Sequence, residues 1–464
     1  MSAGLGRAFF GGEKKSVVDG TETIANGTHL LSKRVCAPHT NIERHAPSGV
    51  VSGVTGSQRR DPMRLCLVLF AIPLAACADN APGTSALVRD SAGVKIVEHP
   101  AGYSAPTWQL SAAPLLDIGA ESGDSSTLLY QVEGAHRLSD GRIVVANRST
   151  HELRYYDDTG NYLYSAGRKG QGPGEFEYIA WTASCGADSV FAYDIVNRRL
   201  SVFDDRGVFA RSFMLVLPSG VGPYGPGTCN SNGTFLLSGR ATAPFVAGPS
   251  RPARPLALIG SDGTALKSLG EFPGGDRHGY VREGGGGGDT GPRPLGKDLS
   301  YVMGHRQFYV GTADTYEIRI YNLDGELRTL IRKDRSDLAI TPSDIEGFIA
   351  DAVEAVSNAN RRRALERLYR DMEFPESFPA YSRLILDELG NLWVQNYLRP
   401  GESQPVWNVF GPEGMQIAEV STPPGLHVYE IGANYVLGEW QDELDIEHVR
   451  IFTLLKPGSE RVAF

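Results

Sequence analysis

The chain of 464 residues has no apolar run of the roughly 20 residues that a membrane-spanning helix needs. It also lacks the His-x-His and His-Glu-x-x-His spacings of many metal sites and the Gly-x-Ser-x-Gly turn of many serine hydrolases. Acidic residues (54) outnumber basic ones (45), and the excess is larger still, a net charge of −13, over residues 77–464, which predicts no binding to nucleic acid or to anionic lipid surfaces. These absences favour a binding protein over an enzyme.

The segment from Met63 to Cys77 meets the requirements of a secretory signal peptide. Arg64 precedes a short apolar core over residues 65–73, and the segment ends in Leu-Ala-Ala-Cys. This tetrad resembles the lipobox of bacterial lipoproteins, and the resemblance implies cleavage before Cys77 and acylation of its thiol. Two or more acyl chains make a stable membrane anchor. We therefore expect an extracytoplasmic protein of the bacterial cell envelope, at the outer membrane because Ala78 rather than Asp follows the cysteine.

A start at Met63 leaves residues 1–62 without a structural role, and they show no sustained period of 3.6 or 2. They are either an upstream extension that is not translated or a disordered cytoplasmic tail. Residues 77–464 hold 36 basic and 49 acidic residues, a net charge of −13. We divide the chain into this extension, the signal peptide (63–76), a tether with a first strand (77–105) and a folded body (106–464).

An internal repeat determines the predicted fold of the body. Each copy joins two β-rich runs through a polar loop and ends in a tight turn at glycine, which is typical of antiparallel strands. The closing glycines Gly160 and Gly207 are 47 residues apart, close to the roughly 40 to 50 of a four-stranded propeller blade. The repeat predicts six blades, over residues 132–167, 177–215, 224–270, 298–332, 380–420 and 426–456.

The sixth unit stops before its outer strand, whereas residues 108–119 near the start of the body are strand-like but lie outside every unit. Pairing the two would close a ring of blades and remove the exposed sheet edges. A linear solenoid is the alternative. We predict an all-β, six-bladed β-propeller closed by the N-terminal strand, because the surplus strand at one end matches the missing strand at the other.

The stretch Gly167–Phe176, with Asp-Gly-x-Ile-x-Val-Ala-Asn and Leu-x-Tyr-Tyr-Asp units around it, resembles the NHL-type six-bladed β-propellers, particularly a lipoprotein group of bacteria. The resemblance covers roughly residues 90–464 and is strongest in the first two blades. Blades three, five and six lack the Gly-Pro-Gly-x-Phe link. The family carries no single activity, so the resemblance implies a fold and no function.

Two cysteines remain in the body once the signal peptide is removed and Cys77 is acylated. Cys185 and Cys229 occupy near-equivalent turns before the second strands of adjacent blades. An even pair in an exported protein favours a disulfide. We therefore predict a bridge between blades two and three.

Two insertions interrupt the repeat. Residues 276–294 contain the glycine run 284–288, but a phosphate-binding loop needs a helix after its glycines and none follows, so we predict a mobile surface loop. Residues 341–372, between blades four and five, begin with Thr341 as N-cap, Pro342 and the acidic Asp344. We predict a helical cap over one mouth of the propeller.

Six side chains near the starts or middles of the inner strands are candidates to face the central channel. They are Glu133, His136, Trp181, Tyr301, Arg383 and His427. Two or three imidazoles could hold a channel metal ion, but the ligand spacing does not support one, and no cofactor is predicted. The expected function is a scaffold for a protein, peptide or glycan ligand. The alternative is a hydrolase or lyase, metal-dependent or not, with an active site at the channel mouth near His136, Arg383 and His427.

Overall fold

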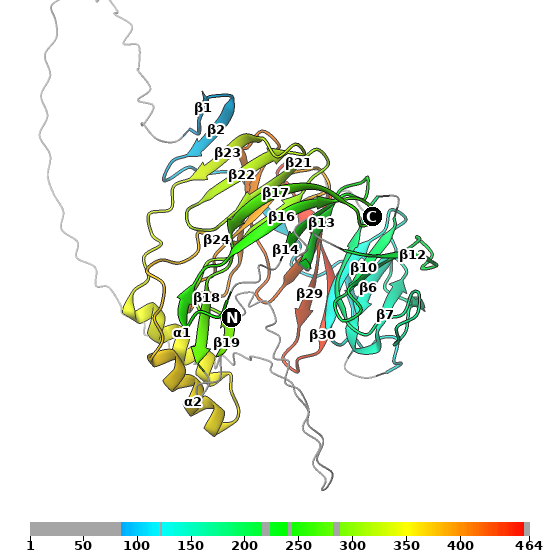
Figure 1. Ribbon diagram of the computed structural model, residues 1–464. Helices are drawn as coiled ribbons and strands as arrows, with labels where there is room; N and C mark the ends of the chain where they lie inside the picture. Colours follow the sequence, from blue (N-terminus) through cyan, green and yellow to red (C-terminus); the bar gives the residue numbers. More distant parts are fainter. Residues whose placement is uncertain are drawn as a thin grey trace, which may run out of the picture. The chain divides into compact units, whose positions relative to one another are not determined.

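The computed structural model describes residues 85–120, 123–186, 188–215, 223–239, 244–281 and 288–458. Cys77, the signal peptide and the upstream extension, to which the sequence assigns the lipid anchor, lie outside these residues. Within them the chain is nearly all β, with two α-helices and a 3₁₀ turn at Arg148–Thr150. The fold is the predicted six-bladed β-propeller (Figure 1).

Blades one to three are antiparallel sheets of four strands, ordered as in the sequence. Blade one comprises β5 (Val132–Arg137), β6 (Ile143–Asn147), β7 (Glu152–Tyr156) and β8 (Tyr162–Ala166). Blade two comprises β9 (Ile179–Ser184), β10 (Val190–Asp194), β11 (Arg199–Phe203) and β12 (Phe209–Met214). Blade three comprises β13 (Pro223–Cys229), β14 (Phe235–Gly239), β16 (Ala253–Ile259) and β17 (Ala265–Pro273).

Blades four and five follow the same order, and blade six has three consecutive strands. Blade four comprises β20 (Ser300–Met303), β21 (Gln307–Gly311), β22 (Glu317–Asn322) and β23 (Leu327–Lys333). Blade five comprises β24 (Tyr381–Leu386), β25 (Leu392–Asn396), β26 (Val406–Phe410) and β27 (Gln416–Ser421). Blade six comprises β28 (His427–Ile431), β29 (Tyr435–Gln441) and β30 (Glu447–Leu455).

The blades form a closed ring. The first strand of each blade contacts the first strand of the next, in the order β5, β9, β13, β20, β24 and β28, and β28 contacts β5 again. These six strands therefore surround the centre. A linear solenoid, in which the first and last blades would not meet, is excluded.

The predicted closing strand is present. β4 (Leu116–Ile118) pairs antiparallel with β30, so that Ile118 lies opposite Val449 and Leu116 opposite Ile451. β3 (Thr107–Leu110) lies between the outer strands of blades five and six, parallel to β27 and antiparallel to β30. The N-terminal segment thus supplies the outer strand that blade six lacks.

A hairpin precedes this closing segment, where the sequence predicts a tether and a single strand. β1 (Leu87–Ser91) and β2 (Val94–His99) are joined by Ala92 and Gly93, both at positive φ (54° and 79°), as a tight two-residue hairpin requires. β2 continues blade four by pairing in parallel with β23. The N-terminal segment therefore passes along the outer rims of blades four, five and six in turn.

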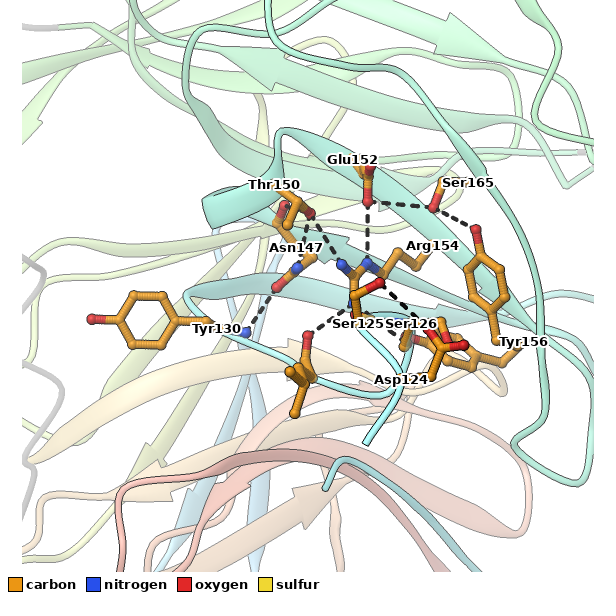
Figure 2. A network of polar contacts seen from close by, with 12 residues as sticks. Asp124, Ser125, Ser126, Tyr130, Asn147, Thr150, Glu152, Arg154, Tyr156 and Ser165 are labelled. Atoms are coloured by element: carbon orange, nitrogen blue, oxygen red, sulfur yellow. Dashed lines mark hydrogen bonds and ion pairs between the residues drawn. The ribbon is translucent and has the colours of Figure 1, made fainter. Parts of the chain in front are cut away.

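The connection from β4 to blade one is held by Arg154, whose side chain is buried (Figure 2). Its guanidinium donates to the carbonyl oxygens of Ser125 (2.9 Å) and Leu128 (2.8 Å), and its Nε donates to Glu152 (3.2 Å). Tyr156 donates from its hydroxyl to the Ser126 carbonyl at 2.9 Å. Side chains of blade one thereby fix the segment through which the ring closes.

Recurring Asp-x-x-Gly turns explain the repeat seen in the sequence. Asp157 Oδ1 accepts the backbone N–H groups of Thr159 (3.0 Å) and Asn161 (2.8 Å), and Gly160 takes φ +89°, which suits a residue without a Cβ. Asp204 and Asp387 make the same pair of bonds in blades two and five.

Cys185 and Cys229, the predicted pair, form a disulfide with their Cα atoms 5.8 Å apart. Cys185 follows β9 and Cys229 ends β13, so the bridge joins blades two and three.

The two insertions differ in how well they were predicted. The second contains α1 (Pro342–Glu354) and α2 (Ala359–Arg370), with the expected Thr341 N-cap and a reciprocal bond from the Thr341 N–H to Asp344. The first is not simply a surface loop. It forms β18 (Arg277–Val281) and β19 (Gly288–Pro292), which make a small sheet with β15 (Gly248–Ser250). Most of the glycine run lies outside the described residues.

Loss of packing at the closing strand should destabilise the whole ring. Ile118→Ala removes a side chain that is 3% exposed and should lower the free energy of unfolding by about 2 to 5 kcal/mol. Leu115→Ala, in the same segment but 49% exposed, should change it by less than about 0.5 kcal/mol. Urea unfolding of both variants measures the difference, and equal effects would show that β4 does not close the ring.

Candidate functional site

The two ends of the propeller differ in the length of their connections. Antiparallel pairing sends the turns after the first and third strands of each blade to one end, and the connections after the second and fourth strands to the other. At the first, the turn end, the described connections have at most five residues. At the second, the insertion end, the connections 240–252, 274–299 and 334–380 are far longer. Figure 1 shows α1, α2, β18 and β19 gathered there.

The three long connections meet in a polar cavity of about 330 Å³, the insertion pocket. The first connection contributes Arg251, the second contributes Asp276, Arg293 and Lys297, and the third contributes Glu373 and Glu376. Asp314 comes from the turn after β21 in blade four. The lining residues are Arg251, Asp276, Arg293, Lys297, Asp314 and residues 373–377.

Arg251 holds the pocket together and has little capacity left for a ligand. It donates to the carbonyl oxygens of Gly274 and Thr312 (both 2.8 Å) and to Asp314 (2.5 Å). Arg293 donates to the Glu373 carbonyl at 2.9 Å, which attaches the second long connection to the third. Arg251 therefore acts mainly as a structural tie, whereas Arg293 adds to its one hydrogen bond only an ion pair with the Glu373 carboxylate at 3.6 Å, among the described residues.

Lys297 differs from Arg251 because its ammonium group is only partly satisfied. Among the described residues, its Nζ donates one hydrogen bond, to the Ser377 carbonyl at 3.0 Å, whereas an ammonium has three donors. Burial lowers the pKa of Lys297, an effect that the nearby carboxylates of Asp276 and Asp314 partly offset. The group is a donor that can bind a carboxylate or hydroxyl of a ligand.

The six candidate channel residues lie on the first strands of five blades, but the structure does not assemble them into one site. Glu133 forms an ion pair with Arg148, whose guanidinium lies 4.4 Å from the ring centre of Tyr178. His136 Nδ1 lies 3.2 Å from Glu430 Oε2 on β28. These two contacts involve different partners and join blade one to blades two and six.

Trp181 and Tyr301 belong to hydrophobic cores between blades. Trp181 packs edge-on against Phe235, with ring centres 6.3 Å apart. Tyr301 packs against the cluster between blades three and four that contains Leu258 and Phe272.

Arg383 and His427 are the two candidates in contact with each other. Arg383 Nη1 lies 3.3 Å from His427 Nε2, and because a guanidinium only donates, this imidazole nitrogen accepts. Desolvation within the ring lowers the pKa of Arg383 to about 10. In the described ranges, no three His, Cys, Asp or Glu side chains are placed to hold a metal ion. None of the helices there is long and apolar enough to cross a membrane.

Sequence reasoning missed the insertion pocket. Arg251, Lys297 and Asp314 come from three connections and show no motif in the sequence. The available signal was the uneven length of the connections, because long loops on one face of a propeller often carry its binding function.

Comparison with known proteins agrees with the fold. The family described as "6-bladed beta-propeller" matches residues 126–204, which span blade one and most of blade two. No curated protein matches the chain significantly.

Several solved structures resemble the chain at low identity. One is a protein of Bacteroides fragilis NCTC 9343 provisionally described as exported (13% identity, 78% of this chain and 99% of that chain, TM-score 0.44). Another is a member of the DUF4221 family from Bacteroides vulgatus (12%, 76% and 99%, TM-score 0.45). A third is virginiamycin B lyase from Staphylococcus aureus (10%, 75% and 99%, TM-score 0.36). Identities this low transfer no activity to the chain.

Lys297 should titrate below an ordinary lysine. Its pKa is lower in the folded protein than in the unfolded chain. At a pH below both pKa values the ammonium is charged in both states, and its burial lowers the free energy of unfolding. That free energy should therefore rise as the pH increases from the folded pKa toward the unfolded value of about 10.4. The rate of acetylation of Lys297 against pH, followed by mass spectrometry, should have its midpoint below that of the same residue in the urea-unfolded chain. Coincident midpoints would contradict the burial of this ammonium.

Proposed function

We propose that this protein is a lipid-anchored, extracytoplasmic scaffold that binds a carboxylate-bearing peptide or glycan at the insertion end of its propeller. The observation that carries the proposal is the meeting of three long connections in one polar pocket around Lys297. Short turns at the other end leave no comparable loops there. A site built from loops on a rigid scaffold is a common arrangement for binding.

The chemistry of the pocket supports the proposed ligand class. Arg251 is occupied by the protein itself, whereas the remaining donors of Lys297, with those of Arg293 beside them, are available for an anion or a hydroxyl. Asp314, with its side chain 44% exposed, lies beside them and can accept a hydrogen bond from an amine or a sugar hydroxyl. A peptide C-terminus and a uronic acid share the carboxylate that this arrangement suits.

The enzymatic alternative has one feature in its favour, the pairing of His136 with Glu430, which would orient an imidazole as a base. However, His136 Nε2 is buried and has no hydrogen-bond partner among the described residues. A substrate would have to reach that atom. The half-buried, partly satisfied Lys297, which lines the pocket, therefore supports the scaffold over a hydrolase or lyase.

The anchor depends on Cys77. In the proposed lipoprotein, Cys77→Ser should abolish labelling by an alkyne-tagged fatty acid and move the protein from the membrane fraction to the soluble fraction. Cys185→Ser/Cys229→Ser serves as the control, because it also replaces cysteines with serine but should leave labelling intact. A Cys77→Ser protein that still carries label would disprove this attachment site.

Ligand binding should depend on Lys297. The purified protein is used to probe two arrays, one of peptides with free or amidated C-termini and one of neutral or uronic oligosaccharides. In one of the two arrays, the members that bear a carboxylate should give signals. Lys297→Gln should reduce these signals about tenfold or more, in line with the loss of a hydrogen bond to a charged group. Lys267→Gln, at the turn end, should not. Equal binding of amidated and free termini, or of neutral and uronic sugars, would refute the ligand class.

A further inference from the structure

We propose that α2 is a docking surface for anionic phospholipid headgroups, which turns the insertion end of the propeller toward the membrane that carries its anchor. The helix holds five arginines and one acidic residue. All five arginine side chains are exposed: Arg361, Arg362, Arg363, Arg367 and Arg370. This concentration of positive charge stands out in a body with a net charge of −13.

Three of the five arginines lie on one side of the helix. Arg363, Arg367 and Arg370 follow the i, i+4, i+7 spacing that places side chains on a common face. The opposite side carries Leu365 and Tyr369, and Tyr369 packs against Phe348 of α1 at 5.2 Å between ring centres. The apolar side therefore packs on α1, and the face with Arg363, Arg367 and Arg370 is left exposed.

The protein neutralises little of this charge. Among the described residues, one ion pair involves α2, between Arg370 and Glu366 of the same helix. Arg362 and Arg363 bond to the Val356 carbonyl and to Asn360, which are uncharged. α1 carries four acidic residues, Asp344, Glu346, Asp351 and Glu354, yet no described ion pair joins it to α2. The two helices keep their charges separate.

The course of the N-terminal segment argues for a membrane as the occupant, and here the inference rests on the proposed anchor at Cys77. Leu87 pairs with Glu98, one residue before the end of β2. β2 runs parallel to β23, and the Asp334 N–H donates to the His99 carbonyl at 2.9 Å where the helical insertion begins. The folded part therefore starts at the insertion end.

The chain between Cys77 and Leu87 is short. Ten residue steps span at most about 35 Å when fully extended. An acylated Cys77 would hold the insertion end, and with it α2, near the bilayer surface. Arginine side chains suit this position because their planar guanidinium binds phosphate through paired hydrogen bonds.

Vesicle binding tests the proposal without the anchor. The full chain with Cys77→Ser is mixed with phosphatidylglycerol-containing vesicles or with pure phosphatidylcholine vesicles at about 0.1 M salt, and co-sedimentation is measured. We expect binding to the anionic vesicles only, and its loss at about 1 M salt, where the Debye length falls to about 3 Å. Equal binding to both vesicles, or to neither, would overturn the proposal.

Matched variants locate the surface. Arg363→Gln/Arg367→Gln/Arg370→Gln should weaken partitioning by on the order of 100-fold, since each arginine near an anionic surface accounts for about fivefold. Gln has nearly the helix propensity of Arg, and circular dichroism checks that α2 remains folded. The control variant Arg206→Gln/Arg306→Gln/Arg328→Gln replaces three exposed arginines at the turn end. It loses the same charge and should have little effect on vesicle partitioning. Equal losses in both triple variants would indicate net charge rather than α2.

The two proposals can fail separately. If Cys77 carries no lipid, fatty-acid labelling of the wild-type protein fails while vesicle binding by the Cys77→Ser protein is unaffected. If α2 does not bind headgroups, labelling succeeds and the arginine variants bind vesicles as well as their parent does. The second result would overturn the docking surface and leave the anchor in place.

Discussion

The pairing of β4 with β30 is the interaction on which the rest of the ring depends. Without this pairing, the incomplete last blade would expose a sheet edge, which closure of the ring removes. Blade six obtains its outer strand from residues that precede blade one, so both ends of the folded body are fastened in one sheet. Buried polar groups support the join: Glu447 accepts the Val132 N–H at 2.7 Å, and Tyr429 donates to the Val132 carbonyl at 3.0 Å.

Closure from the N-terminal side also determines where the chain enters the propeller. Before it reaches β30, the N-terminal segment passes along the rims of blades four and five. It pairs with blade four through β2 and with blade five through β3. His99 is buried between these blades, with Nε2 accepting the Gln416 N–H at 3.0 Å and Nδ1 lying 3.1 Å from the Arg332 carbonyl. Burial lowers the pKa of His99, which keeps the imidazole neutral, as both bonds require. The entry point and the ring closure are thus parts of one structure.

The sequence predicts what depends on local pattern and misses what depends on distant partners. The blades follow from alternating strands and Asp-x-x-Gly turns, in which Asp157 or Asp204 binds backbone only a few residues away. The closing strand was predictable because a surplus at one end matched a deficit at the other. The pairing of β2 with β23 was not, since parallel pairing across more than 200 residues leaves no local mark. The hairpin β18–β19 was missed for a different, local reason, because β19 (Gly288–Pro292) contains two glycines, an aspartate and a proline, all of which are depleted in strands.

For the candidate sites too, the sequence predicted what depends on local pattern and missed what depends on distant partners. The interpretation of net charge is the clearest example. Placing His136, Arg383 and His427 on inner strands required only the repeat, but their partners come from neighbouring blades and could not be read from spacing. The overall charge of −13 argued against any anionic surface as a partner. Yet charge acts over about a Debye length of 8 to 10 Å, which is shorter than a propeller blade is wide, so a partner responds to the exposed charges nearest to it and not to the sum over the chain. Segregation of acidic residues on α1 and arginines on α2 gives the insertion end a local field that the total conceals.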